Sequence, residues 1–171
     1  VDYDRSFRRM TYTVGDIDVP PDVYVADIDG RNERRLTDVH RDLLNEIDLN
    51  SRPAETVHWN STDGTRIEGF LIYPHNYDPR ASYPLVVMNH GGPHAASGYG
   101  FSFKNKLFSA HGYFVFMPSS FEARGFCDKH DDAGRIPKTF DDGAEENFGR
   151  IYDIEAASSY VCARPDVDCD R

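Results

Sequence analysis

The run Tyr83–Asn89, YPLVVMN, is short and almost purely apolar, and it is bounded by Pro84 and by the pair Gly91-Gly92. Such a run is typical of a strand buried on both faces, as in a parallel sheet flanked by helices. A second run of this kind, Tyr113–Met117 (YFVFM), follows it along the chain. Two buried strands in succession therefore indicate a mostly parallel α/β sheet that is covered on both faces.

Helical patterns lie after each of these strands. Phe101–His111 places Phe103, Leu107 and Phe108 on one face, which we expect to face the core, and Gly112 is suited to end the helix. Asn147–Arg164 has apolar residues every three to four positions, the pattern of an amphipathic helix. The 119–143 stretch between the second strand and this helix is polar and longer than a plain loop, which predicts an excursion near a functional face.

The chain before residue 83 reads as hairpins. Thr56–Asn60 and Arg66–Tyr73 alternate around an Asp-Gly turn and predict two antiparallel strands. Arg9–Val14, Pro21–Asp29 and Glu33–Leu36 predict a further β-rich segment with little helix potential, which is too small to bury a core alone. We therefore divide the chain into residues 1–49 and residues 50–171, where Asp166–Arg171 leads into another strand.

The most informative loop, Asn89-His90-Gly91-Gly92-Pro93-His94, leaves the end of the first buried strand and precedes a helix. Ligands of open α/β sheets bind at the carboxyl ends of strands, so this loop is expected to face the site. Two glycines let the backbone turn sharply and bring an N–H group close to a ligand. Such a donor stabilises the oxyanion of acyl transfer by about 3–4 kcal/mol. An ordinary glycine turn is the alternative interpretation.

Several stretches resemble the prolyl oligopeptidase family of serine peptidases, and its acylaminoacyl-peptidase-like branch most. They are DVYVADIDGRNERRLT (residues 22–37) and PAETVHWNSTDGTRIEGFLIYPHNYDPRASYPLVVMNHGGPHA (residues 53–95), with DGTRIEGFLIYP and HGGP the most specific parts. The resemblance implies that residues 1–45 end the last blade of a β-propeller. It also implies that residues 50–171 form the first half of an α/β-hydrolase sheet, a hairpin plus parallel strands with flanking helices.

The same resemblance implies the roles of five residues. Gly92 would supply the oxyanion-hole N–H, with His90 and Gly91 shaping the loop around it. His94 and Arg124 would lie on the substrate side, and Arg124-Gly125 matches the family's arginine-glycine element. After that element the family continues with glycine and tyrosine, whereas this chain has Phe126-Cys127-Asp128-Lys129-His130.

No G-x-S-x-G nucleophile elbow occurs in the 171 residues. We therefore expect the catalytic serine, acid and base downstream of Arg171, so that this chain holds half of an active site. The expected function is a serine peptidase acting on short peptides or acylated amino acids. The alternative is a truncated, non-catalytic hydrolase relative that binds a ligand or a partner. A complementing chain, pairing with an open sheet edge after the 113–117 strand, or a homo-oligomer, is a third interpretation.

Composition narrows the partners. Lys and Arg total 19 against 29 Asp and Glu, and a net charge of −10 argues against nucleic acid. No run approaches the ~18 apolar residues of a membrane span. Three cysteines are too few for a disulfide framework and favour a reducing compartment such as the cytoplasm, although one bridge remains open.

We expect no metal or cofactor. The Gly-Gly-Pro between His90 and His94 rules out the helix that would place both imidazoles on one face. Cys127 and His130 have no second Cys/His pair nearby.

Overall fold

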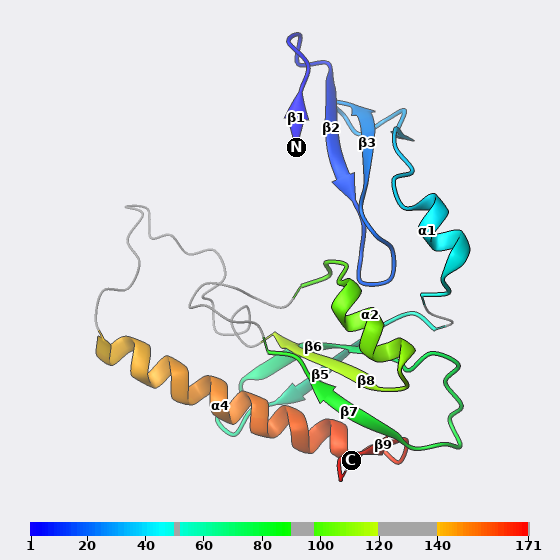
Figure 1. Ribbon diagram of the computed structural model, residues 1–171. Helices are drawn as coiled ribbons and strands as arrows, with labels where there is room; N and C mark the ends of the chain where they lie inside the picture. Colours follow the sequence, from blue (N-terminus) through cyan, green and yellow to red (C-terminus); the bar gives the residue numbers. More distant parts are fainter. Residues whose placement is uncertain (50–51, 90–97, 120–139, 171) are drawn as a thin grey trace.

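Two β-sheets and three helices make up the parts of the chain that the computed structural model describes, which are residues 1–49, 52–89, 98–119 and 140–170 (Figure 1). Side chains are described for all of these except residues 140–150. The site residues His90, Gly91, Gly92, His94 and Arg124 lie outside the described residues.

The first sheet is antiparallel, and its strands follow the order β1-β2-β3-β4. Their bounds are β1 Asp2–Tyr3, β2 Arg9–Val14, β3 Asp22–Asp27 and β4 Arg34–Arg35. Gly30, in the turn between β3 and β4, has φ +82°, a conformation that glycine adopts without strain. The three strands expected in this segment are therefore present, although β4 is shorter than predicted.

The second sheet has the order β5-β6-β8-β7-β9. Its strands are β5 Glu55–Asn60, β6 Arg66–Ile72, β7 Tyr83–Val87, β8 Phe114–Ser119 and β9 Val167–Asp168. β5, β6 and β8 pair antiparallel, whereas β8, β7 and β9 pair parallel. The sheet is thus mixed, with the parallel part that the apolar runs predicted and an antiparallel hairpin at one edge.

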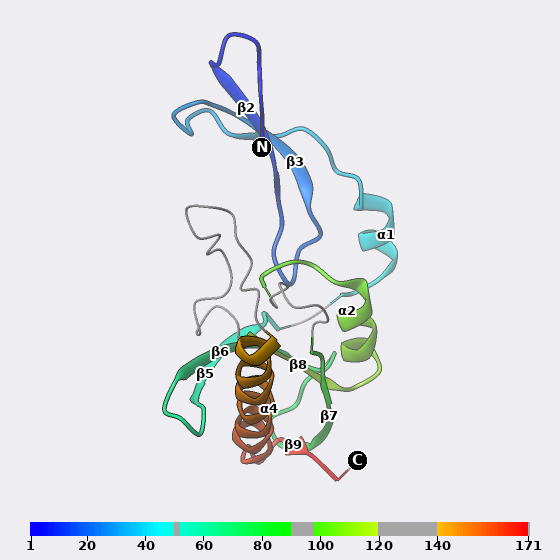
Figure 2. The same cartoon turned by 90° about the vertical axis from the view of Figure 1, so that its left-hand side faces the viewer.

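Side chains of β8 alternate between two cores because successive residues of a strand point to opposite faces. Phe114 and Phe116 pack on one face with Ala157 and Val161, whereas Val115 and Met117 pack on the other. Helix α4 (Phe140–Cys162) covers the first face, and helix α2 (Phe103–Ala110) covers the second. The two views show these helices on opposite sides of the sheet (Figures 1 and 2).

Two expectations about the strands are wrong. The 113–117 strand has no open edge, because β8 lies between β6 and β7. All six residues of β8 are buried, whereas those of β7 are only half-buried. β7 loses cover because its outer neighbour β9 pairs with it only through Tyr83↔Val167 and Pro84↔Asp168.

The helices also depart from expectation. A short helix, α1 (Arg41–Glu46), lies in the segment expected to have little helix, and it buries none of its residues. α4 begins at Phe140, so the end of the predicted 119–143 excursion is helical, consistent with the high helix propensity of Ala144 and Glu145.

Helix α2 presents a different face from the one predicted. Phe103 and Leu107 are exposed, and Asn105, Lys106 and Ser109 are buried in their place. The buried polar groups have partners: the Ser109 hydroxyl donates to the Tyr73 carbonyl (2.6 Å), and the Lys106 ammonium pairs with Asp18. Phe108 alone of the three predicted apolar residues packs against the core.

Within the described ranges, none of the helices is long and apolar enough to cross a lipid bilayer.

Candidate active site

The candidate site is expected at the carboxyl ends of the parallel strands β7 and β8. Val87 of β7 is the register partner of Phe116 in β8, and the Met88 N–H donates to the Phe116 carbonyl (2.8 Å). The two parallel strands therefore run towards the same end of the sheet, where β8 continues three residues past the partner of Val87, to Ser119. In the sequence, residues 90–94 follow β7 and Arg124 follows β8, and both segments lie outside the described residues.

The chain is anchored where it re-enters the described structure after residue 97. The Tyr99 ring packs on Phe70, with 4.5 Å between the ring centroids, and its hydroxyl lies 3.0 Å from the Thr56 hydroxyl. The Ser102 hydroxyl then accepts the Asn105 N–H and caps α2. Both ends of the segment that carries HGGP are thus held by the sheet, one by β8 and the other by β5 and β6.

Ser119, at this edge, has a position that sequence reasoning missed. The apolar run ends at Met117 and predicts that the polar 119–143 stretch begins at Ser119, but Ser119 is the last residue of β8 and is completely buried. Its hydroxyl has no hydrogen-bond partner among the described groups. Because the pairing register decides its burial, the local sequence held no signal for it.

A network of charged and aromatic side chains lies at the other end of the sheet, near the amino ends of β7 and β9. The Arg164 guanidinium donates to both carboxylate oxygens of Asp166 (3.1 Å each) and to the Tyr73 hydroxyl (3.2 Å). The Tyr77 hydroxyl donates to Asp166 (2.5 Å), and the Tyr73 hydroxyl donates to Glu55. Every member has a partner within the network, which is the mark of a structural assembly.

These contacts shift the pKa values of the network. Burial raises the pKa of the Asp166 carboxyl, but hydrogen bonds from Arg164 and Tyr77 outweigh burial and lower it overall. Burial, followed by the hydrogen bond to Asp166, raises the pKa of Tyr77 to about 12. Hydrogen bonding to Asp166 is the largest cause of the raised pKa of Arg164. The network therefore keeps Asp166 ionised, and Tyr77 and Arg164 protonated, at neutral pH.

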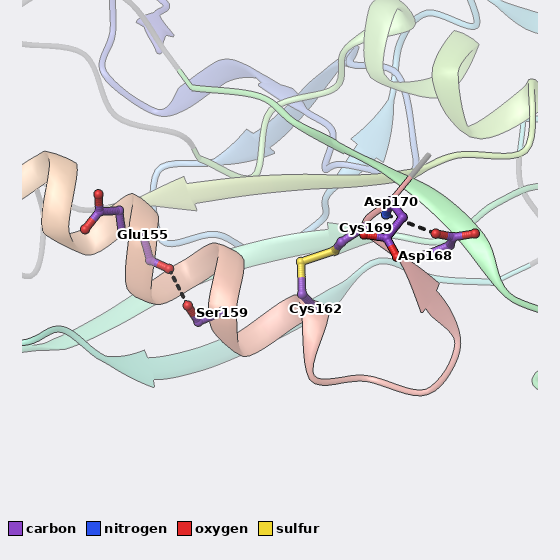
Figure 3. The surroundings of a disulfide bond; sticks show 6 residues. All are labelled: Glu155, Ser159, Cys162, Asp168, Cys169 and Asp170. Carbon is purple, nitrogen blue, oxygen red and sulfur yellow. Dashed lines mark hydrogen bonds between the residues drawn. A yellow bond between two sulfur atoms is a disulfide. The ribbon is translucent and has the colours of Figure 1, made fainter.

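A disulfide lies next to this network. Cys162, at the end of α4, is bonded to Cys169, just after β9 (Figure 3). The loop between the two cysteines carries Arg164 and Asp166. The sequence, with three cysteines, allowed one disulfide, and this is that bond. The third, Cys127, lies outside the described residues, as does His130.

The described residues enclose a cavity of about 710 Å³. The 18–20 segment, the end of α1 and residues 47–49, 52 and 53 line it. Asp48, which lines this cavity, is 3.8 Å from the imidazole of His75, a residue that follows the end of β6. Among the described residues no three His, Cys, Asp or Glu side chains gather as a metal site.

Sequence comparisons relate the chain to curated peptidases. Dipeptidyl-peptidase 5 of Aspergillus oryzae is 38% identical over 71 residues, 40% of this chain and 10% of that protein. The Emericella nidulans protein named "Probable dipeptidyl-peptidase 5" is 29% identical over 157 residues, 86% of this chain and 20% of that protein. The matched segments thus span a tenth to a fifth of these relatives. No family model matches the chain.

Solved peptidases share the fold. Acylaminoacyl peptidase of Pyrococcus horikoshii superposes with a TM-score of 0.68 and 22% identity, covering 94% of this chain and 24% of that one. Prolyl oligopeptidase B of Galerina marginata gives a TM-score of 0.68 with 17% identity, covering 96% of this chain and 22% of the other. These structural similarities confirm the expected α/β-hydrolase-type fold. By its sequence relatives and its fold, the chain is related to the peptidases of the prolyl oligopeptidase family.

Proposed function

We propose that this protein is a serine peptidase that cleaves short peptides or acylated amino acids by acyl transfer. One observation carries the proposal: the HGGP sequence leaves the carboxyl end of β7, the third strand of the second sheet, and leads into α2. An α/β-hydrolase takes an oxyanion donor from the loop at this position. The named relatives, a dipeptidyl-peptidase and an acylaminoacyl peptidase, support the choice of substrates.

The Gly92 N–H is assigned to the oxyanion hole. A serine hydroxyl attacks the scissile carbonyl carbon, its proton passes to the general base, and the carbonyl oxygen takes up the negative charge. The N–H donates to that oxygen and stabilises it more strongly in the transition state than in the substrate. His90 and Gly91 shape the loop, and His94 and Arg124 contact the substrate.

The 171 residues hold no G-x-S-x-G, so the proposal assigns the serine, the acid and the histidine base to residues outside this sequence. The second candidate function is that of a non-catalytic relative that binds a ligand or a partner chain. The coding sequence after Arg171 separates the two, because an in-frame G-x-S-x-G is expected only for the enzyme.

The experiment uses the full-length protein, a fluorophosphonate probe, and p-nitroanilides of dipeptides and of acylated amino acids. Gly92→Pro removes the N–H and should lower kcat by about 10²–10³-fold with little change in KM. Gly92→Ala retains the N–H and is the first control. Gly98→Pro is the second, since Gly98 is exposed with open space around it. A wild-type protein that neither reacts with the probe nor cleaves these substrates contradicts the proposal. Unchanged kcat in Gly92→Pro contradicts the assignment of Gly92.

A further inference from the structure

We propose that the loop between β2 and β3, residues 15–21, is a positioning element for helix α2. It would thereby hold the segment that precedes α2 in the sequence, which carries HGGP. The importance of that segment for turnover rests on the proposed function, whereas the contact between the loop and the helix does not. Figure 1 shows this loop reaching from the first sheet down to α2.

The loop has a fixed shape of its own. The Asp16 carboxylate accepts the N–H groups of Asp18 and Val19 (2.7 Å each), and the Asp16 N–H donates to the Val19 carbonyl (3.0 Å). A Cβ at Gly15 would lie only 2.7 Å from the Cα of Pro21, so the turn closes too tightly for any larger residue. The loop therefore presents residues 17 and 18 in one defined arrangement.

Ile17 joins the core of the second sheet. Its side chain is 4% exposed and belongs to the cluster that includes Phe70, Val115 and Met117, against which Phe108 of α2 also packs. One apolar residue of the β2–β3 loop thus shares a core with Phe108 of α2 and with the strands of the second sheet. The loop is a packed part of the α2 face, not a surface contact.

Asp18 supplies the only carboxylate paired with Lys106 among the described residues. Its Oδ1 lies 2.5 Å from the Lys106 Nζ, and its Oδ2 accepts the Ala54 N–H (2.8 Å). The Lys106 side chain is 2% exposed, against 27% for Asp18. An ammonium group buried to this extent needs a paired carboxylate, because desolvating a lone charge is costly.

The pair matters for α2 because no apolar stripe fixes the rotation of this helix. Phe103 and Leu107 are exposed, and the helix is oriented through Lys106 and Ser109, together with Phe108. Without the Asp18 carboxylate, the buried Lys106 ammonium group must be hydrated instead. Hydration requires α2 to rotate or to move away from the sheet. The start of the helix, and the segment before it, would move with it.

The test combines hydrogen exchange with kinetics on the full-length protein. In Asp18→Asn, amides of residues 98–110 should exchange at least about tenfold faster, since a buried charge has lost its partner. Lys106→Met should have a smaller effect on exchange, because the Asp18 carboxylate that loses its partner is partly exposed and can be hydrated. The double variant should resemble Lys106→Met, and Lys106→Arg should retain slow exchange. Arg80→Met, which breaks the exposed Arg80–Asp78 pair, is the matched control and should leave α2 unchanged.

Kinetics separate positioning from stability alone. Asp18→Asn should lower kcat for a peptide p-nitroanilide by about tenfold or more at a temperature where it is fully folded, and Lys106→Arg should retain activity. Unchanged exchange in residues 98–110 of Asp18→Asn would overturn the contact. Faster exchange with unchanged kcat would overturn the positioning role. A protein without any peptidase activity would defeat the proposed function, while hydrogen exchange would still decide whether the loop holds α2.

Discussion

Loss of the Cys162–Cys169 disulfide should lower the free energy of unfolding by about 2.4 kcal/mol. The two cysteines are seven positions apart, so the bond closes a loop of eight residues. Closing such a loop removes roughly 8 cal/mol/K of entropy from the unfolded chain, which is about 2.4 kcal/mol at 25 °C. For a folding unit of this size, the corresponding fall in Tm is about 5–10 °C.

The effect should concentrate at the network beside the bridge. Arg164 and Asp166 lie within the closed loop, and Val167 begins the short pairing of β9 with β7. With the bridge reduced, these residues gain freedom in the native state as well. Amides of residues 163–168 should then exchange faster, in addition to the lower global stability.

The assay is thermal unfolding with and without dithiothreitol. Wild-type protein should lose stability on reduction, whereas the Cys162→Ser/Cys169→Ser double variant should start lower and show no response. Cys127→Ser is the control and should respond as the wild type does. Peptide mapping without reductant should recover Cys162 and Cys169 in one linked fragment. Free thiols at both positions, or a wild-type Tm that ignores dithiothreitol, would refute the reasoning. A confirmed bridge would argue for an oxidising compartment, against the reducing one that the cysteine count favours.

Three further predictions concern packing and pH. Gly69→Ala should destabilise by about 1–3 kcal/mol in urea unfolding, because its Cβ would lie 2.9 Å from each of two aromatic rings, whereas Gly100→Ala, with open space, should be neutral. The pKa of Asp22 is lowered to about 2, chiefly by backbone and side-chain hydrogen bonds. Its stabilisation is therefore complete above pH 4 and lost as the pH falls towards 2, and thermal melts of Asp22→Asn should lack this dependence. Tyr77→Phe removes the hydroxyl bonded to Asp166 and should cost about 1–2 kcal/mol at pH 7 by urea unfolding. The wild-type advantage should fade as the pH rises from 10 towards 12, since the native pKa of Tyr77 is raised.

Local patterns predicted the strands well, because the apolar pattern within a strand reflects which of its faces are buried. β2 and β8 lie where alternating or apolar runs placed them, and the Asp63-Gly64 turn has the positive φ that its glycine suggested. The fold class followed from the same runs. The order of strands did not, since pairing partners leave no mark in a short apolar segment. β8 was therefore expected at an edge and lies instead between β6 and β7.

The candidate site was predicted from one loop and a family resemblance, and its geometry could be predicted only in outline. The sequence places HGGP after a strand and Arg124 after the next. It does not reveal that the two strands are neighbours at one edge, which the register of Val87 with Phe116 shows. The burial of Ser119 depends on that same register. Such properties belong to the sheet as a whole, and no window of a few residues contains them.

The hydrophobic pattern failed at α2 for a related reason. Lys106 can lie on the inner face of α2 because it pairs with Asp18, which is 88 positions away in the loop between two strands of the first sheet. A boundary drawn between residues 49 and 50 follows the change in sequence character, but it separates Lys106 from its carboxylate and Ile17 from its core. A folding unit is bounded by where buried groups find their partners. By that criterion the β2–β3 loop belongs with the second sheet, whatever architecture the rest of residues 1–49 joins.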